Sequence, residues 1–350
     1  GTESLSKILE RDDGFELIGF MFPEMKNDLL NIKKLGQYLD KHVAPKHSQS
    51  VIVNMTIARA AQDIGIDQTP VGRFDGLKNI AGKVGFTEAL KIRDVALENN
   101  VDTVDTAVAY GNSEDALGSI GVDNFKVVTK LPAIPENISD IHGWVHAQIK
   151  ASLKRLKKES LYGLLMHDPR SLSGNHAHEI VEALETLKAS GIVSKIGVSV
   201  YNPADLEGIS RIMSLDLVQA PLNVVDRRLI TSGWLKRLAN SGVEVHTRSS
   251  FLQGLLLLPR VKIPKKFEIW SALWDFWHYE LIKRDLNPVE ACLRYVMSVS
   301  QVDRVIVGVE TASQLGEIIT AVNRTNISTD WSPMACDDEN LINPSNWDRT

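Results

Sequence analysis

The chain has 350 residues, of which 43% are hydrophobic, so it is long enough for one large α/β barrel or for two ordinary domains. Its formal net charge of -5 at pH 7 gives no basic field that would indicate nucleic acid or an anionic membrane as the main partner. No apolar run approaches the roughly 20 residues of a membrane span, and the first residues lack the basic-then-apolar layout of a signal peptide.

The two cysteines and the first residue bear on the cellular setting. Cys292 and Cys336 are not spaced like a zinc site or a disulfide framework, which favours a reducing, cytoplasmic location. The chain begins with Gly1 rather than Met, which suggests a cloning remnant or a fragment of a longer polypeptide.

Residues 1–50 do not follow the pattern of the rest and are expected to be an N-terminal extension, the first of three parts of the chain. A strand over 13–23 and an apolar-faced helix over 25–43 are expected there, followed by a linker. They either cap the next domain or form the tail of an upstream domain. The expected second part is a barrel over 51–325, and the third is a tail over 326–350, with Trp331 and Trp347 packing on the barrel.

From about residue 86, helix and strand patterns alternate. Seven strands are expected, and each crossover between them is long enough for a helix, which requires parallel pairing. The strand segments are 101–107, 123–132, 160–169, 193–203, 215–223, 243–250 and 302–309. An eighth strand is expected upstream, at 50–58 or 63–67. Eight such units over about 270 residues predict a (β/α)8 TIM barrel with an extra N-terminal strand and helix. An open doubly wound sheet is disfavoured because no G-x-G-x-x-G turn follows a strand. An aromatic-rich excursion at 257–290 interrupts the seventh unit. It is expected to pack in the core, cover a pocket or contact another subunit.

Polar residues stand where three neighbouring strands end. Asp105 and Tyr110 follow the first of them, Lys130 ends the second and His167 ends the third. Each has an ordinary explanation: Asp105 as a helix cap, Lys130 as a solvated strand end, and His167 with Asp168 as a turn or part of a metal site. Because these strand ends meet at one mouth of a barrel, their joint occurrence favours a catalytic cluster, and no metal is expected.

The chemistry of this set is that of a proton donor beside a polarised carbonyl group. A tyrosine has a reference pKa of about 10, but a nearby ammonium group favours its phenolate. Lys130 is the expected ammonium group, and Asp105 is expected to hold it by an ion pair. A neutral His167 would donate a hydrogen bond to a substrate carbonyl oxygen.

Five segments carry a further signal: VDTVDTAVAYGNSEDALG, KVVTKLP, YGLLMHDP, KIGVSVYNP and LDLVQAPLNVVDRR. Through them the chain resembles the aldo-keto reductase superfamily over about residues 60–325, in its short-loop bacterial form, with Asp, Tyr-Gly, Lys and His in the family's order. The resemblance implies NAD(P)H-dependent reduction of an aldehyde or ketone, with Tyr110 as general acid, Lys130 and Asp105 tuning it, and His167 orienting the substrate. A sugar-derived substrate is favoured by the resemblance of NVVDRRL and FLQGLLLLP to members associated with saccharide metabolism.

The resemblance also implies a site for NADP(H) or NAD(H). Ser199 and Gln219 would hold the nicotinamide amide, although Val200 replaces an asparagine that the family often has. Arg248 stands where many members stack an aromatic ring on the nicotinamide; a guanidinium can stack too, and a strand-end cation is the alternative. The pyrophosphate would lie along the following loop, at Ser249, Leu252, Gln253 and Gly254.

At the adenosine end, VGVETASQLGEI replaces the family's phosphate-binding segment. Gly308 and Gln314 stand where NADPH-preferring members have Lys and Arg, with Glu310 nearby, so weakened selectivity for NADPH is expected. Backbone N–H groups at the helix that starts from Thr311 would still bind a phosphate.

The start of the barrel departs from the family. Either Gln62 or Gln68 matches a glutamine expected on the first strand, and Asp75 stands in place of an expected tyrosine. The alternative to a reductase is therefore a nucleotide-binding barrel that acts as a regulatory or scaffold module of a longer polypeptide. The expected partner is a small carbonyl compound, with an upstream fused domain or a homo-oligomer also considered; a metal-dependent hydrolase built on His167 and Asp168 lacks further ligands.

Overall fold

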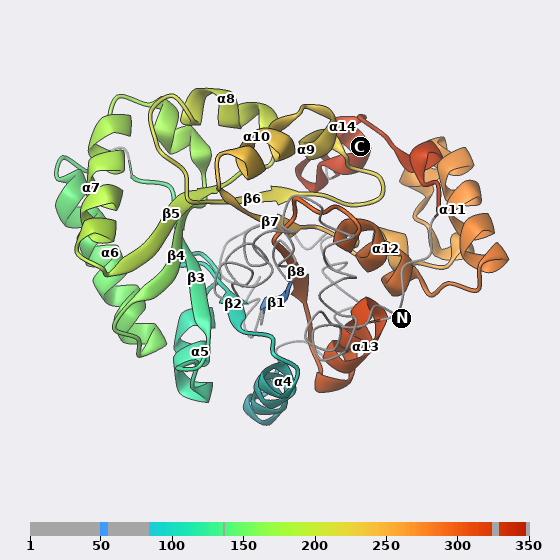
Figure 1. Ribbon diagram of the computed structural model, residues 1–350, viewed down its shortest axis with the longest axis horizontal. Helices are drawn as coiled ribbons and strands as arrows, with labels where there is room; N and C mark the ends of the chain where they lie inside the picture. Colours follow the sequence, from blue (N-terminus) through green and yellow to red (C-terminus); the bar gives the residue numbers. More distant parts are fainter. Residues whose placement is uncertain (1–49, 55–83, 136, 324–328, 348–350) are drawn as a thin grey trace, which may run out of the picture. The chain divides into compact units, whose positions relative to one another are not determined.

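Eight parallel strands close into a barrel, in the spatial order β1 to β8 (Figure 1). The computed structural model describes residues 50–54, 84–135, 137–323 and 329–347. The strands are β1 (Ser50–Asn54), β2 (Thr103–Asp105), β3 (Lys126–Leu131), β4 (Leu161–Met166), β5 (Val193–Ser199), β6 (Leu217–Pro221), β7 (Glu244–Arg248) and β8 (Arg304–Gly308). β1 pairs with both β2 and β8, which closes the ring. The barrel prediction is confirmed, and of the two segments considered for the first strand, 50–58 supplies it.

Helices follow the strands and lie outside them (Figure 1). They include α4 (Phe86–Glu98), α5 (Ser113–Ile120), α6 (Ile141–Leu156), α7 (Ala177–Ala189), α8 (Leu206–Ile209), α9 (Arg228–Thr231), α10 (Trp234–Asn240), α12 (Pro288–Met297) and α13 (Ala312–Asn323). In α7 the buried residues Ile180, Ala183, Leu184 and Leu187 recur at helical spacing, which turns one face to the strands.

The helix expected after β5 is shorter than the sequence pattern predicts. A 3-10 turn, η4 (Pro203–Asp205), precedes α8. The Asn202 side chain accepts the Ala204 N–H at 3.0 Å, which closes a tight turn at Pro203. Gly208 inside α8 further weakens the helix.

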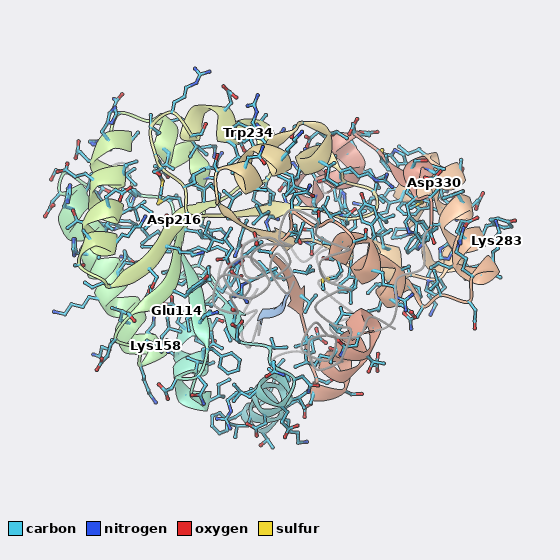
Figure 2. All side chains as sticks on the ribbon, viewed as in Figure 1. Glu114, Lys158, Asp216, Trp234, Lys283 and Asp330 are labelled. Atoms are coloured by element: carbon cyan, nitrogen blue, oxygen red, sulfur yellow. The ribbon has the colours of Figure 1, made fainter. Side chains whose placement is uncertain are left out.

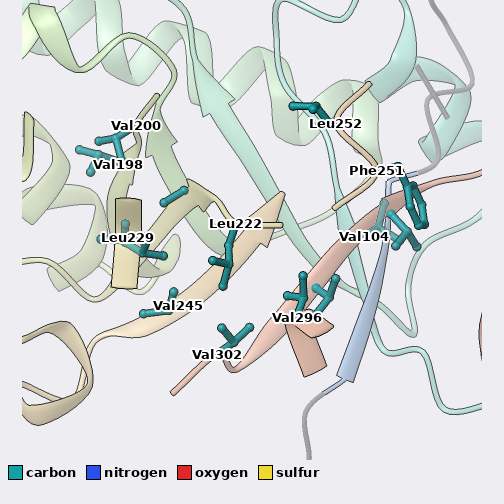
Figure 3. Packing of buried hydrophobic residues seen from close by; sticks show 14 of the residues in the cluster. Val104, Val198, Val200, Leu222, Leu229, Val245, Phe251, Leu252, Val296 and Val302 are labelled. Atoms are coloured by element: carbon teal, nitrogen blue, oxygen red, sulfur yellow. The ribbon is translucent and has the colours of Figure 1, made fainter. Parts of the chain in front are cut away.

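Alternation along the strands separates two packing layers. Val104, Val198 and Val245 belong to the large core cluster (Figure 3). Val128, Leu165 and Leu217 form a separate cluster of inward-facing residues. Because side chains alternate, the residues two positions later on these strands also face inward at the carboxyl end of the barrel.

Hydrogen bonds of outward-facing side chains join the helices to the strands. The carboxylate of Glu114 on α5, labelled in Figure 2, is the shared acceptor. Thr129 on β3 donates to one of its oxygens at 2.7 Å, and Arg155 on α6 donates to the other at 2.8 Å. With Thr129 fixed outward, its neighbour Lys130 is turned inward.

The excursion after β7 packs with the C-terminal segment. It contains η5 (Leu255–Leu257), η6 (Arg260–Lys262), η7 (Lys265–Trp270) and α11 (Ser271–Lys283). Trp274 and Trp277 are completely buried, so this part of the excursion packs in a core.

Two aromatic contacts attach the residues after 328 to the excursion. The Trp331 ring lies 5.1 Å from Trp277, and Trp347 lies 4.9 Å from Phe267, near η8 (Ser332–Met334), α14 (Glu339–Ile342) and η9 (Pro344–Asn346). The expected extension before Ser50 lies outside the described residues, and the boundaries of the three parts remain predictions.

Candidate active site

The inward-facing polar residues gather at the carboxyl ends of the strands. Asp105 ends β2, Lys130 lies near the end of β3, and His167 follows β4; Ser199 ends β5 and Arg248 ends β7. One pocket joins residues from the seven strands β2 to β8 or the segments that directly follow them: Asp105, Tyr110, Lys130, His167, Ser199, Tyr201, Gln219, Arg248 and Ile306. The structure thus brings together the four expected catalytic residues and three of the expected cofactor residues.

Lys130 and Asp105 form a buried ion pair at the base of this pocket. The Lys130 Nζ lies 2.6 Å from Asp105 Oδ2, and each side chain is only 2% exposed. Lys130 Nζ also donates to the Thr106 carbonyl oxygen at 2.9 Å. Gln219 Nε2 donates to the other carboxylate oxygen of Asp105. A buried charge is tolerated when it is paired and hydrogen-bonded in this way, so the ammonium group is held in one place.

Tyr110 reaches the pocket from the turn after β2. The Tyr110 N–H donates to the Ala107 carbonyl oxygen at 3.0 Å, and Gly111 has a φ of 58°, which a glycine adopts at little cost. The Lys130 Nζ lies 5.3 Å from the centroid of the Tyr110 ring. The His167 ring meets the Tyr110 ring edge-on, with centroids 5.6 Å apart.

His167 is neutral at physiological pH. Burial of the imidazole, with added repulsion from Lys130 and Arg248, lowers the pKa of His167 to about 4. A neutral imidazole carries one N–H donor and one acceptor nitrogen. It can therefore donate to an oxygen in the pocket without bringing a positive charge.

Arg248 and Tyr201 form a stacked pair in the pocket wall. The guanidinium carbon lies 4.2 Å from the centroid of the Tyr201 ring, and Nη2 donates to the Val200 carbonyl oxygen at 2.8 Å. Tyr201 and Ile306 are pocket residues that the sequence analysis did not single out. An aromatic residue two positions past a polar strand end was the available signal for Tyr201, whereas Ile306 looks like any strand-interior residue.

The loop after β7 has an unusual backbone. Ser249, Leu252 and Gln253 have φ values of 63°, 46° and 53°, and Gly254 follows at 83°. Left-handed conformations are costly for residues with a Cβ and occur where the surroundings impose them. Leu252 is completely buried (Figure 3), so core packing imposes its conformation.

A buried side chain also fixes the start of this loop. Asn223 Nδ2 donates to the Ser249 carbonyl oxygen at 3.0 Å, while Asn223 Oδ1 accepts two backbone N–H groups of its own turn. The loop residues predicted to contact the cofactor follow Arg248 in the sequence but do not line the pocket: Ser249, Leu252, Gln253 and Gly254.

The residues predicted for the adenosine end lie outside the pocket lining: Gly308 ends β8, Thr311 directly precedes α13 and Gln314 lies in its first turn. Gln314 turns back, so that its Oε1 accepts the Glu310 N–H at 2.8 Å, and Thr311 Oγ1 accepts the Gln314 N–H at 3.2 Å. Glu88 of α4 accepts the Ala312 N–H at 2.8 Å. A carboxylate therefore occupies the first turn of α13. Gly308, the last residue of β8, is exposed.

A family model, the aldo/keto reductase family, matches residues 74–332. The chain belongs to the aldo/keto reductase family. A curated relative, "Uncharacterized oxidoreductase YqkF" of Bacillus subtilis, is 26% identical over 260 residues, covering 69% of this chain and 84% of the relative.

Solved aldo-keto reductases share the fold. The holo form of AKR11C1 from Bacillus halodurans superimposes with a TM-score of 0.60 at 21% identity, covering 72% of this chain and 87% of that one. The glycerol dehydrogenase AKR11B4 from Gluconobacter oxydans gives 0.58 at 20% identity, covering 81% and 89%.

Membership in the family makes this reductase an oxidoreductase of carbonyl compounds, in a family that generally uses NAD(P)H. In the described ranges, no helix is both long and apolar enough to cross a membrane. The candidate glutamines Gln62 and Gln68, and also Asp75, lie outside the described residues.

Proposed function

We propose that this reductase reduces an aldehyde or ketone with Tyr110 as the general acid. The observation that carries the proposal is the convergence of Tyr110, the Lys130–Asp105 pair and His167 on one pocket. Removing a proton from a phenol leaves a phenolate, which an ammonium group nearby stabilises. Lys130 supplies that group, and the ion pair with Asp105 keeps it beside the Tyr110 ring.

His167 would position the carbonyl group. Its low pKa, about 4, keeps the imidazole neutral, so it can donate a hydrogen bond to the carbonyl oxygen. Tyr110 and His167 meet edge-on, and an oxygen in this part of the pocket would have both donors near it. Tyr110 would then give its proton to the oxygen as negative charge develops there.

The polar lining of the pocket supports the proposal of a nicotinamide there. Gln219 is completely buried and donates its Nε2 to Asp105, yet among the described residues no donor reaches its Oε1. Buried acceptors are normally satisfied, so an amide N–H of a ligand is a fitting partner. Ser199 is the register neighbour of Gln219 and lines the same pocket. When bound there, a reduced nicotinamide supplies a hydride for the carbonyl carbon.

The left-handed loop after β7 would hold the pyrophosphate. A turn of this kind can present backbone N–H groups to an anion. The N–H groups of Ser249 and Gln253 would contact the pyrophosphate, while those of Leu252 and Gly254 donate to the Ser249 and Phe251 carbonyl oxygens at 2.9 Å and hold the loop in shape. The hydroxyl of Ser250 supports this, because it is buried and without a partner in the described parts of the chain.

At the adenosine end we propose a preference for NAD(H) over NADP(H). Gly308 and Gln314 offer no cation, and the Glu88 carboxylate already accepts a backbone N–H of the first turn of α13. A second anion such as the 2'-phosphate of NADPH would be repelled there. Thr311 and the remaining backbone N–H groups would contact the ribose side of an NAD(H) molecule.

The finer assignments rest on the sequence alone. We propose a sugar-derived carbonyl substrate. We also propose a cytoplasmic location, which suits two free cysteines. The chain would consist of an extension over 1–50, a barrel over 51–325 and a tail over 326–350.

The proposal is tested by following NADH and NADPH oxidation with a panel of aldehydes and ketones that includes sugar aldehydes. We expect turnover with some members of the panel and little turnover in Tyr110→Phe. Binding of NADH without turnover of any carbonyl compound would favour a regulatory, nucleotide-binding module instead.

A further inference from the structure

Arg248 puts an unbalanced positive charge into the pocket. The other cation of the pocket, Lys130, is paired with Asp105 at 2.6 Å. Among the described residues, Arg248 donates to two neutral groups, the Val200 carbonyl oxygen at 2.8 Å and the Ser249 hydroxyl at 3.5 Å. Within the described residues no carboxylate forms an ion pair with it. Its charge also acts on His167 in the same pocket, since repulsion from Arg248 is one cause of the lowered pKa of that histidine.

The guanidinium group is also held in a fixed orientation. One side lies over the Tyr201 ring, with 4.2 Å between the guanidinium carbon and the ring centroid. Its hydrogen bond to Val200 anchors it to a residue that is completely buried at the end of β5. Arg248 lines the same pocket as Ser199 and Gln219, the residues proposed to hold the nicotinamide amide. A fixed cationic surface therefore lies beside the proposed nicotinamide position.

We infer that Arg248 makes the pocket select the reduced nicotinamide over the oxidised one. This inference rests on the proposed function, since it requires the nicotinamide to enter the pocket. The oxidised ring carries a positive charge, which the fixed guanidinium group repels, whereas the reduced ring is uncharged. The repulsion is weakly screened because Arg248 is partly buried. The consequence is ready release of the oxidised cofactor.

The test is the ratio of the dissociation constants of NAD+ and NADH, measured by titration calorimetry. We expect a ratio of about ten or more in the wild type, which corresponds to roughly 1.4 kcal/mol. Arg248→Gln removes the charge and should lower the ratio about tenfold. Arg248→Lys keeps the charge without the planar group, so it should retain most of the ratio while weakening the binding of both forms.

Arg237→Gln is the matched control, because it removes an arginine charge from an exposed position on α10. Its ratio should equal that of the wild type. A ratio that Arg248→Gln leaves unchanged, with both cofactor forms bound, overturns the inference and leaves the proposed function standing. If the wild type binds neither NADH nor NADPH, the proposed function fails and the inference fails with it.

Discussion

Lys130 shows how single residues build the candidate site. Its ammonium group faces the Asp105 carboxylate, the Thr106 carbonyl oxygen and the face of the Tyr110 ring. The two acceptors hold the nitrogen in place and keep its charge 5.3 Å from the centroid of the Tyr110 ring. A lysine suits this arrangement because its ammonium group is a compact point charge, whereas an arginine carries a planar, forked group.

His167 links the site to the pH dependence of stability. Its pKa is about 4 in the folded chain, against 6.5 for an unperturbed histidine. Between these values the unfolded chain binds more protons, so this contribution to stability is complete above pH 6.5 and is lost as the pH falls toward 4. From pH 7 to pH 5 the loss should be about 1 to 2 kcal/mol.

Urea unfolding at pH 7 and pH 5 measures this loss. The free energy of unfolding of His167→Gln should fall less between the two pH values than that of the wild type. Equal decreases in the two proteins would mean that His167 is not the partly buried, neutral group that the structure indicates.

At the scale of elements, the contact between α4 and α13 controls the proposed cofactor preference. The Ala312 N–H lowers the pKa of Glu88, which keeps a negative charge at the start of α13. Glu88→Gln retains a hydrogen-bond acceptor but removes the charge. We expect the affinity for NADPH to rise about fivefold relative to NADH.

Glu98→Gln is the control for this change. It also removes one negative charge, but from an exposed residue at the opposite end of α4. It should leave the NADPH to NADH ratio of dissociation constants as in the wild type. If both variants shift the ratio equally, net charge rather than the Glu88 contact is responsible.

The packing of α5 on α6 depends on Gly118. A Cβ at this position would lie 2.0 Å from the backbone carbonyl oxygen of Arg155, which cannot move without shifting α6. Gly118→Ala should therefore lower the free energy of unfolding by about 2 kcal/mol.

Gly316 in α13 is the comparison, because a Cβ there meets nothing within 4 Å. Gly316→Ala should raise the free energy of unfolding by about 0.5 to 1 kcal/mol. The melting temperatures of the two variants measure these effects. A Gly118→Ala protein that melts at the wild-type temperature would contradict the close approach of Gly118 to the Arg155 backbone.

At the scale of the whole molecule, the sequence predicted the barrel because its strands alternate with helices at regular intervals. Asp105, Lys130 and His167 were predictable because strand ends of a barrel converge. Ile306 was not, since an apolar residue inside a strand resembles any other core residue of the barrel. The Glu88 contact joins residues 224 positions apart, and no local pattern indicates such a pairing.

Cys292 on α12 reports on opening of the barrel core. It is completely buried, which raises the pKa of its thiol, whereas Cys336 is partly exposed. A neutral thiol reagent should modify Cys336 first and Cys292 only at the rate of global unfolding. In Cys336→Ser the early phase should vanish; an early phase that persists would show that α12 opens by itself.

The most direct test of the assignment of Tyr110 as the proton donor is kcat/KM for carbonyl reduction by Tyr110→Phe, with the cofactor dissociation constant measured on the same preparation. We expect kcat/KM to fall by about 100-fold or more, as loss of a general acid does, with cofactor binding retained. A Tyr110→Phe protein that reduces the same substrate at the wild-type rate would contradict the assignment of Tyr110 as the proton donor.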